Sequence, residues 1–283
     1  MSIDKSVRPK KHLGQNFLQD QNILARIVKY ADLKAGEPVL EIGPGTGNLT
    51  KHLAAAKARV LALDSDPDVL AVAHKALASF ANVELRHQNV IRMDWPAMIR
   101  DFAGTGLPIS IVANIPYYIT TPILEKLTEV KPLLRQAVIM MQQEVGERIL
   151  AQPGTKAYGS LSVFLNYHFH IEKAFDVSAT CFYPRPHVDS VVLRFVPRAR
   201  TDWGDAMNRV FTEEMLFALI RCAFWSRRKT FVNCIKASPF LKPHLRPQAL
   251  KAYKSTEWDS RRRGETLTVE EFIRFAELLE NFG

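Results

Sequence analysis

Three glycines spaced by two residues follow a short apolar run. The run Val39–Gly43 leads into Pro-Gly-Thr-Gly, which supplies Gly45 and Gly47. Such glycines let the backbone approach a ligand closely, and a following helix presents its N-terminal N–H groups there. A dinucleotide-binding turn would have Gly or Ala at position 48, where this chain has Asn48. The spacing therefore indicates a ligand at Gly43 and Gly45 but departs from the dinucleotide pattern; a tight turn without a ligand is the alternative.

An acidic residue ends the next predicted strand. Asp64 stands twenty-one residues after Gly43 and can accept hydrogen bonds from both hydroxyls of a ribose. The alternative role for Asp64 is to cap the helix that begins at Pro67. Asp66 fits that role better, because Pro67 then occupies the first helical position. Asp64 is therefore predicted to face the ligand.

The tetrapeptide Asn114-Ile-Pro116-Tyr117 carries the most specific chemistry. Adenine N6 is a poor nucleophile because its lone pair is delocalised into the ring. The amide oxygen of Asn114 and a backbone carbonyl oriented by Pro116 can each accept one N6 hydrogen, which localises the lone pair. Tyr117 can stack on a flipped-out base, worth about 1–3 kcal/mol. The alternative is an Asn-Pro turn with a core tyrosine.

Alternating strands and helices are predicted to position these residues. This alternation predicts an α/β fold, with a mostly parallel sheet and helices on both faces. Two later runs with no helix between them predict an antiparallel pair at one sheet edge. The predicted strands are 39–43, 60–64, 83–87, 109–113, 137–141, 168–177 and 190–196, and the helices among the parallel strands are 49–56, 67–80, 95–102 and 122–130.

The pattern changes after Pro197, where helical segments separated by prolines and Gly264 predict an all-α region. These segments are 203–224, 229–236, 247–253 and 268–281. We therefore expect a basic arm at 1–12, an α/β domain at 13–199 and an all-α domain at 200–283. The arm holds four Lys/Arg and one Asp, and the last region holds fifteen Lys/Arg and eleven Asp/Glu, out of a net charge of +9. This distribution favours a polyanionic partner, although a solvated basic surface is the alternative.

Other features exclude several classes of protein. The cysteines Cys181, Cys222 and Cys234 are odd in number and far apart, which argues against a disulfide framework and C-x-x-C metal chemistry. His168 and His170 alternate without a third ligand, so we expect no metal. The chain shows no signal peptide and no apolar run of 18 residues. We expect a cytoplasmic protein without membrane association, acting as a monomer.

The glycine turn, in the form E-x-G-x-G-x-G, resembles motif I of S-adenosylmethionine-dependent methyltransferases. Over nearly its whole length the sequence resembles the bacterial small-subunit ribosomal RNA adenine dimethyltransferases (the KsgA/RsmA type). The motifs form an ordered set that is far more specific than any one of them. The matching stretches are 14–18 (GQNFL), 41–47 (EIGPGTG), 114–117 (NIPY), 182–190 (FYPRPHVDS) and 223–230 (AFWSRRKT).

The resemblance implies a Rossmann-like fold, S-adenosylmethionine as cofactor and a role for each matching residue. Asn16, Leu18 and Gly43 would contact the methionine end of the cofactor, and Asp64 would hold its ribose. Asn89 would contact the cofactor's adenine where the family usually has Asp; the family also usually has Glu at the position of Asp64. The remaining roles are orientation of the target amine by Asn114 and a sandwich of the target base by Tyr117 and Phe182, for which a core aromatic is the alternative. Separately, the basic run Arg227, Arg228 and Lys229 next to Trp225 suits RNA phosphates, with a solvated helix face as the alternative.

The implied reaction is N6-dimethylation of two adjacent adenines in a hairpin loop of small-subunit (16S) ribosomal RNA. The partner would be a partly assembled small subunit, which implies a role in ribosome biogenesis. One alternative is the antibiotic-resistance type of methyltransferase, which methylates one adenine in large-subunit ribosomal RNA. Two others are a glutamine methyltransferase acting on protein and an assembly factor that binds RNA without catalysis. The segment Arg227–Thr230 favours the small-subunit enzyme over the resistance type.

Overall fold

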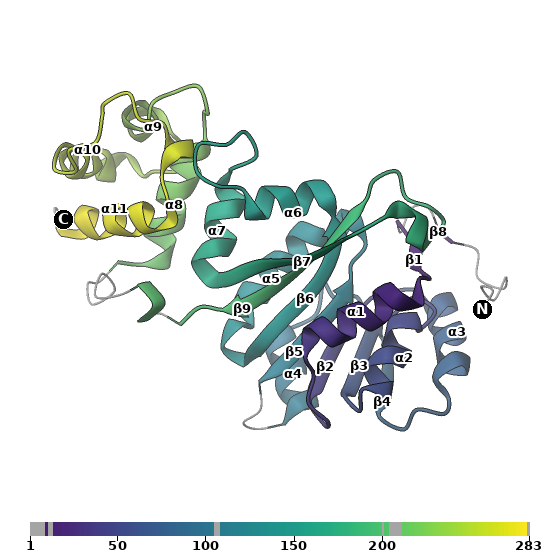
Figure 1. Ribbon diagram of the computed structural model, residues 1–283. Helices are drawn as coiled ribbons and strands as arrows, with labels where there is room; N and C mark the ends of the chain where they lie inside the picture. The colour runs from purple at the N-terminus through teal and green to yellow at the C-terminus, as the bar shows by residue number, and fades with distance from the viewer. Residues whose placement is uncertain (1–8, 11–13, 105–107, 200, 204–210, 282–283) are drawn as a thin grey trace. The chain divides into compact units, whose positions relative to one another are not determined.

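The described residues form two compact units. The computed structural model describes residues 9–10, 14–104, 108–199, 201–203 and 211–281. The first unit comprises residues 1–146 and 170–197, and the second comprises residues 147–169 and 198–283. Figure 1 labels the elements of both units.

A seven-stranded sheet forms the frame of the first unit. Its strand order is β4-β3-β2-β5-β6-β9-β7, in which the pairs from β4 to β6 are parallel and β9 runs antiparallel to β6. The predicted mostly parallel sheet, with the two later strands together at one edge, is confirmed. The strands are β2 (Pro38–Ile42), β3 (Arg59–Asp64), β4 (Val83–His87), β5 (Ile109–Asn114), β6 (Leu134–Gln142), β7 (Phe169–Val177) and β9 (Ser190–Pro197).

Side chains alternate between the two faces of this sheet. Val39 of β2 and Val60 of β3 belong to a core that also contains Leu24 of α1 and Leu53 of α2. The next residue of β2, Leu40, is fully buried on the opposite face. The sheet is therefore covered on both sides, as Figure 1 shows for α1 in front. The helices of this unit are α1 (Gln21–Ala31), α2 (Asn48–Ala55), α3 (Pro67–Leu77), α4 (Trp95–Ala103), α5 (Thr120–Glu129) and the start of α6 (Gln143–Leu150).

A separate two-stranded sheet joins residues far apart in the sequence. Strand β1 (Phe17–Leu18) pairs antiparallel with β8 (Phe182–Tyr183), with Phe17 opposite Tyr183 and Leu18 opposite Phe182. This pairing was not predicted, because two-residue strands leave no periodic pattern in the sequence. It brings the Gln-Asn-Phe-Leu stretch beside the segment that begins at Phe182.

The second unit is helical and has its own core. Leu216, Phe231, Phe272 and Phe275 are buried in it together with Tyr158. Its helices are α7 (Ser160–His168), α8 (Glu213–Phe224), α9 (Phe231–Ala237), α10 (Arg246–Lys254) and α11 (Val269–Asn281). The helix expected from Trp203 begins at Glu213 among the described residues, and 204–210 lie outside them.

The compact units differ from the predicted domains at residues 147–169. This stretch was predicted to belong to the α/β domain at 13–199, but it groups with the helices after 198. Tyr158, Val163 and Tyr167 lie in the helical core, and the Tyr158 hydroxyl donates to the Leu267 carbonyl oxygen at 2.8 Å. The stretch joins the second unit because its apolar side chains are buried there, although it lies between two strands of the first.

Candidate active site

A cavity of about 310 Å³ lies at the carboxyl ends of the parallel strands. The chain runs from β2 to β3 and β4 in one direction and returns to β5 on the other side of β2. Ligands of open α/β sheets bind where the strand order reverses in this way. Gly43, Asp64, Asn89 and Asn114 all line the cavity, each at or just after the end of its strand.

The glycine turn after β2 has a backbone that other residues rarely adopt. Gly43 has φ of +69° and Gly45 has φ of +56°, both in the left-handed region. A Cβ on Gly45 would lie 3.0 Å from Cδ1 of Phe17, and a Cβ on Gly43 would lie 3.7 Å from the Asn114 carbonyl oxygen. The turn is therefore packed between the Gly14–Leu18 segment and the end of β5.

Glu41 places a buried carboxyl group in the cavity wall. Its side chain is 1% exposed, and neither oxygen has a hydrogen-bond partner among the described residues. Burial raises the pKa of Glu41 to about 8, with nearby Asp64 adding to the rise and the Thr50 hydroxyl opposing it. Without a partner this carboxyl is therefore mostly protonated at neutral pH, and a cation beside it would favour the ionised form, so this wall is suited to a cationic ligand.

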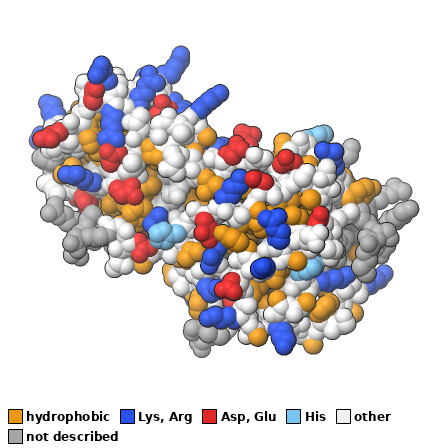
Figure 2. Space-filling model, in the orientation of Figure 1, with side chains coloured by type: hydrophobic (Ala, Val, Ile, Leu, Met, Phe, Trp, Pro, Cys, Tyr) orange, Lys and Arg blue, Asp and Glu red, His pale blue; other side chains and the backbone are white. Residues whose placement is uncertain are grey.

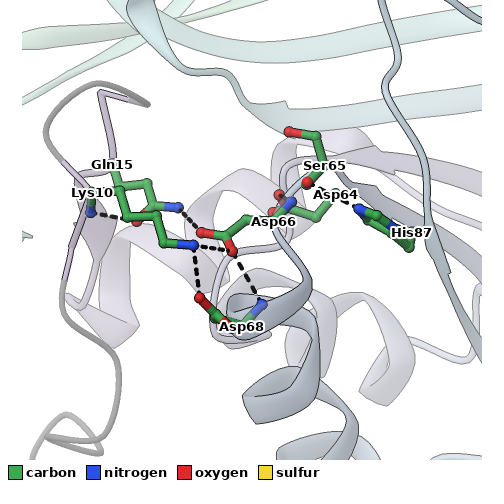
Figure 3. A network of polar contacts seen from close by, with 7 residues as sticks. All are labelled: Lys10, Gln15, Asp64, Ser65, Asp66, Asp68 and His87. Atoms are coloured by element: carbon green, nitrogen blue, oxygen red, sulfur yellow. Dashed lines mark hydrogen bonds and ion pairs between the residues drawn. The ribbon is translucent and has the colours of Figure 1, made fainter.

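Asp64 and Asp66 have the separate roles that the sequence predicts. Asp66 caps α3 by accepting from the Asp68 N–H at 3.1 Å, with Pro67 in the first turn. Asp64 lies at the cavity, where it accepts from the Asp66 N–H at 2.9 Å (Figure 3). Burial raises the pKa of the Asp64 carboxyl, and hydrogen bonds from backbone N–H groups oppose the rise. A carboxylate has about four lone-pair sites, so Asp64 can still accept from ligand hydroxyls.

Lys10 and Gln15 attach the start of the described chain to α3. Lys10 Nζ lies 2.7 Å from carboxylate oxygens of both Asp66 and Asp68, and Gln15 Nε2 donates to Asp66 at 2.8 Å (Figure 3). Burial opposes ionisation of Asp66, but its hydrogen bonds from Lys10 and Gln15 lower its pKa. Lys10 is therefore neutralised within the protein. The other basic residues of the expected arm, Lys5, Arg8 and Lys11, lie outside the described residues.

The Gly14–Leu18 segment closes one side of the cavity, where the sequence analysis expects Asn16 and Leu18. Asn16 Nδ2 donates to the Gly14 carbonyl oxygen at 3.1 Å. Asn48 Nδ2, from the first turn of α2, donates to the Leu18 carbonyl oxygen at 3.0 Å. Asn48 thus ties this segment to the glycine turn. The structure brings both predicted residues to the cavity.

Asn89 lies at the cavity beyond the end of β4. Its Oδ1 accepts from the Ile91 N–H at 3.0 Å, and the side chain is exposed. A carbonyl oxygen has two lone pairs, so Oδ1 retains one for a ligand amine.

Asn114 and Tyr117 stand together where β5 ends. Asn114 Nδ2 lies 3.5 Å from the Asn16 carbonyl oxygen, and no described residue donates to its Oδ1. The Tyr117 hydroxyl lies 3.1 Å from Ser190 Oγ at the start of β9, which fixes the ring. Burial raises the pKa of the Tyr117 hydroxyl. The arrangement leaves one amide oxygen and one aromatic ring available at the cavity, with Pro116 at φ −57° between them.

Phe182 also lines the cavity, but it is 5% exposed and packs in the core beside Leu18. The structure therefore brings Phe182 and Tyr117 to one cavity, with Phe182 the more deeply buried. A sandwich of the target base between them stays a prediction.

The basic segment Arg227–Lys229 lies in the helical unit, after α8. Arg227 is paired with Glu265 at 2.8 Å and donates to the Lys156 carbonyl oxygen at 2.8 Å. Lys229 Nζ lies 4.8 Å from the ring centroid of exposed Trp225. Arg228 is exposed and has no ion-pair partner among the described residues. Figure 2 shows Lys and Arg side chains projecting from the helical unit with acidic side chains among them.

Glu41 and Tyr118 are cavity residues to which the sequence patterns assigned no role. Glu41 was present in the recognised glycine motif, and its position inside an apolar strand was a signal of buried charge. Tyr118 lines the cavity and is 57% exposed, but one aromatic residue beside another carried no separate signal.

Within the described ranges, no group of three or more His, Cys, Asp or Glu side chains could hold a metal ion. None of the described helices has both the length and the apolar character needed to span a membrane.

Comparison with known sequences identifies the family. The sequence matches the ribosomal RNA adenine dimethylase family over residues 7–280. A ribosomal RNA small subunit methyltransferase A from Moorella thermoacetica is 40% identical over 282 residues, covering 98% of this chain and 95% of that protein. The protein of the same name from Geobacillus sp. (strain WCH70) is 39% identical over 272 residues, covering 96% and 92%.

Two solved structures are similar to this chain over most of its length. A dimethyladenosine transferase from Plasmodium falciparum is 26% identical with a TM-score of 0.73, covering 92% of this chain and 95% of that one. The 23S rRNA methyltransferase ErmE is 25% identical with a TM-score of 0.67, covering 93% and 99%. With its glycine turn, Asn-Ile-Pro-Tyr segment and helical unit in place, this chain belongs to the ribosomal RNA adenine dimethylase family.

Proposed function

We propose that this protein transfers methyl groups from S-adenosylmethionine to N6 of two adjacent adenines in a hairpin loop of small-subunit ribosomal RNA. The observation that carries the proposal is the free Oδ1 of Asn114 beside the ring of Tyr117 at the cavity wall. The small-subunit relatives at 39–40% identity favour this substrate over that of ErmE at 25%. We also propose that it acts as a monomer in the cytoplasm.

Asn114 orients the nucleophilic amine, and Tyr117 holds the base that carries it. Asn114 Oδ1 accepts one hydrogen of the adenine N6 amine, which localises the nitrogen lone pair. Tyr117 stacks on the base, and its hydroxyl contact with Ser190 holds the ring in place. Phe182 supplies the opposite apolar wall of the base site. Holding the amine in one orientation removes much of the entropic cost of reaching the transition state.

The residues present fit S-adenosylmethionine, whose sulfonium supplies an electrophilic methyl group when it is bound. The buried, unpartnered Glu41 carboxyl suits a cationic ligand, and Gly43 and Gly45 hold the turn at positive φ values that residues with side chains rarely adopt. Asp64 would hold the ribose and Asn89 the adenine, with Asn16 and Leu18 at the methionine end. Gly45→Val should abolish cofactor binding in calorimetry, because its side chain would meet Phe17 at a positive φ.

We propose that the helical unit docks the RNA through Arg228 and Lys229, with Trp225 beside them. A loop within a partly assembled small subunit is a suitable substrate, because unpaired bases are readily flipped out.

The test is mass spectrometry of ribosomal RNA nucleosides from cells with and without this protein. Loss of N6,N6-dimethyladenosine from small-subunit RNA on deletion is the expected result. Loss of a modified adenine from large-subunit RNA alone would instead assign the ErmE-like activity.

A further inference from the structure

Two exposed aromatic side chains lie in the segments that form the base site. Five large hydrophobic side chains are exposed in the described part of the chain: Tyr118, Tyr183, Val188, Trp225 and Phe240. Tyr118 directly follows the Asn-Ile-Pro-Tyr segment, and Tyr183 directly follows Phe182. The two rings are 57% and 52% exposed. Exposed tyrosine rings in these segments offer faces on which unpaired bases can stack.

Both rings adjoin the Gly14–Leu18 segment. Tyr118 lines the cavity, and its Cδ1 lies 3.4 Å from where a Cβ on Gly14 would stand. Tyr183 is the strand partner of Phe17, three residues further along. Three extended residues span at most about 11 Å. Tyr118 therefore lies at one end of the Gly14–Phe17 stretch and Tyr183 at the other, next to the cavity-lining Phe17 and Phe182.

The loop after Tyr183 has both of its ends at the base site. It begins next to Phe182 and ends at Ser190, whose Oγ lies 3.1 Å from the Tyr117 hydroxyl. Arg185 within this loop is exposed and has no ion-pair partner among the described residues. An unpaired cation between exposed apolar side chains is the combination that binds unpaired nucleotides, since bases stack on the rings and phosphates pair with the cation.

We propose that Tyr118, Tyr183 and Arg185 form a second RNA contact at the rim of the cavity, which holds the unpaired nucleotides next to the adenine being methylated. This inference rests on the proposed function. A base that enters the cavity brings its two neighbours to the rim, because the backbone is continuous. The rim contact would thus select a single-stranded loop, while Asn114 and Tyr117 act on the target base itself.

The test uses a synthetic small-subunit rRNA hairpin with 2-aminopurine beside the target adenine. Binding is measured with S-adenosylhomocysteine present, so that no transfer is needed. Tyr118→Ala and Tyr183→Ala should each weaken RNA binding about tenfold and remove the quenching of 2-aminopurine. Arg185→Ala should lower the salt slope of binding by about 0.7. In turnover, these losses should appear in KM for RNA rather than in kcat.

Tyr118→Phe and Tyr183→Phe are the matched controls, because they keep the stacking ring and should bind RNA like the wild type. Phe240→Ala, an exposed aromatic of the helical unit, controls for general loss of apolar surface. Wild-type RNA affinity in both tyrosine-to-alanine variants would overturn the proposal. So would a Tyr118→Ala variant that loses cofactor affinity while keeping RNA affinity. If the wild type binds the hairpin through this rim yet methylates no adenine, the proposed function fails and the rim contact stands.

Discussion

The cavity of the first unit and the basic segment of the helical unit use their polar groups differently. At the cavity, Glu41 and Oδ1 of Asn114 are left without partners among the described residues, and the backbone around them is fixed by close packing. In the basic segment, Arg227 is paired with Glu265 and with the Lys156 carbonyl oxygen, while Arg228 is exposed. A polar group left unsatisfied in a rigid wall indicates a ligand, whereas a count of cations does not say which of them are available.

The largest expected effect of a substitution is the loss of methyl transfer at Asn114. Asn114→Ala should lower kcat for methyl transfer by about 100-fold or more, because the amine loses its orienting acceptor. Cofactor affinity should stay within a few-fold. Asn48→Ala is a matched control in the same cavity: it frees the Leu18 carbonyl oxygen and should weaken cofactor binding while transfer at saturating cofactor persists. Isothermal calorimetry and single-turnover assays separate the two. An active Asn114→Ala enzyme would mean that another group orients the amine.

In the basic segment, Arg228 and Lys229 should affect RNA binding, whereas Arg227 should affect stability. Changing Arg228 and Lys229 to Glu should weaken RNA binding and flatten its salt dependence, by about 0.7 in slope for each phosphate that is no longer neutralised. Arg227→Ala should instead lower the melting temperature, because it removes an ion pair and the hydrogen bond to the 156 carbonyl oxygen. Filter binding at several salt concentrations and thermal melts give both readouts. Equal RNA-binding losses in all three variants, with unchanged melting, would contradict this division.

Glu41 makes the cavity sensitive to pH. Its folded-state pKa of about 8 lies above the ordinary value of 4.5, so its contribution to stability is fully present below pH 4.5 and is lost as pH rises through 8. Glu41→Gln cannot ionise. The melting temperature of this variant should therefore rise relative to that of the wild type between pH 5 and 8, in cofactor-free protein. At pH 8 with saturating S-adenosylmethionine, the wild type should instead have the higher melting temperature, because the cationic ligand pairs with the Glu41 carboxylate. A pH-independent difference would contradict the account.

The smallest expected effect is a change in cofactor affinity at Asn89. Asn89→Asp should tighten cofactor binding by about 1 kcal/mol, roughly fivefold, because a charged acceptor makes a stronger hydrogen bond. The bond from the Ile91 N–H is kept by the new carboxylate. Calorimetry measures the change, and equal or weaker binding would show that Asn89 does not face the adenine.

The sequence predicts the cavity residues well because they stand at the ends of strands, and the strands are recognisable from their apolar runs. Gly43 follows β2, and Asp64 and Asn114 are the last residues of β3 and β5. The apolar runs of these strands are plain in the sequence, and the carboxyl ends of parallel strands meet at one edge. The separation of Asp64 from the capping residue Asp66 was predictable for the same reason, since Pro67 marks the first helical turn.

What the sequence did not predict depends on long-range pairing. The β1–β8 sheet joins residues about 165 positions apart and is two residues long. Helix α1, which was not predicted either, is an exception, because its signals are local: Asp20 is its cap, and Leu24, Ile27 and Ala31 are buried at helical spacing. The partner of Arg227 lies 38 residues away, at Glu265. Such pairings follow from packing, which local patterns do not record.

The most direct test is methylation of purified ribosomal particles. Unmethylated small subunits, large subunits and naked ribosomal RNA are each incubated with labelled S-adenosylmethionine and either wild-type protein or Asn114→Ala. The account predicts dimethyladenosine at two adjacent positions of small-subunit RNA with the wild type, and none above background with the variant. Label in a single adenine of large-subunit RNA, or transfer by Asn114→Ala at the wild-type rate, would contradict it.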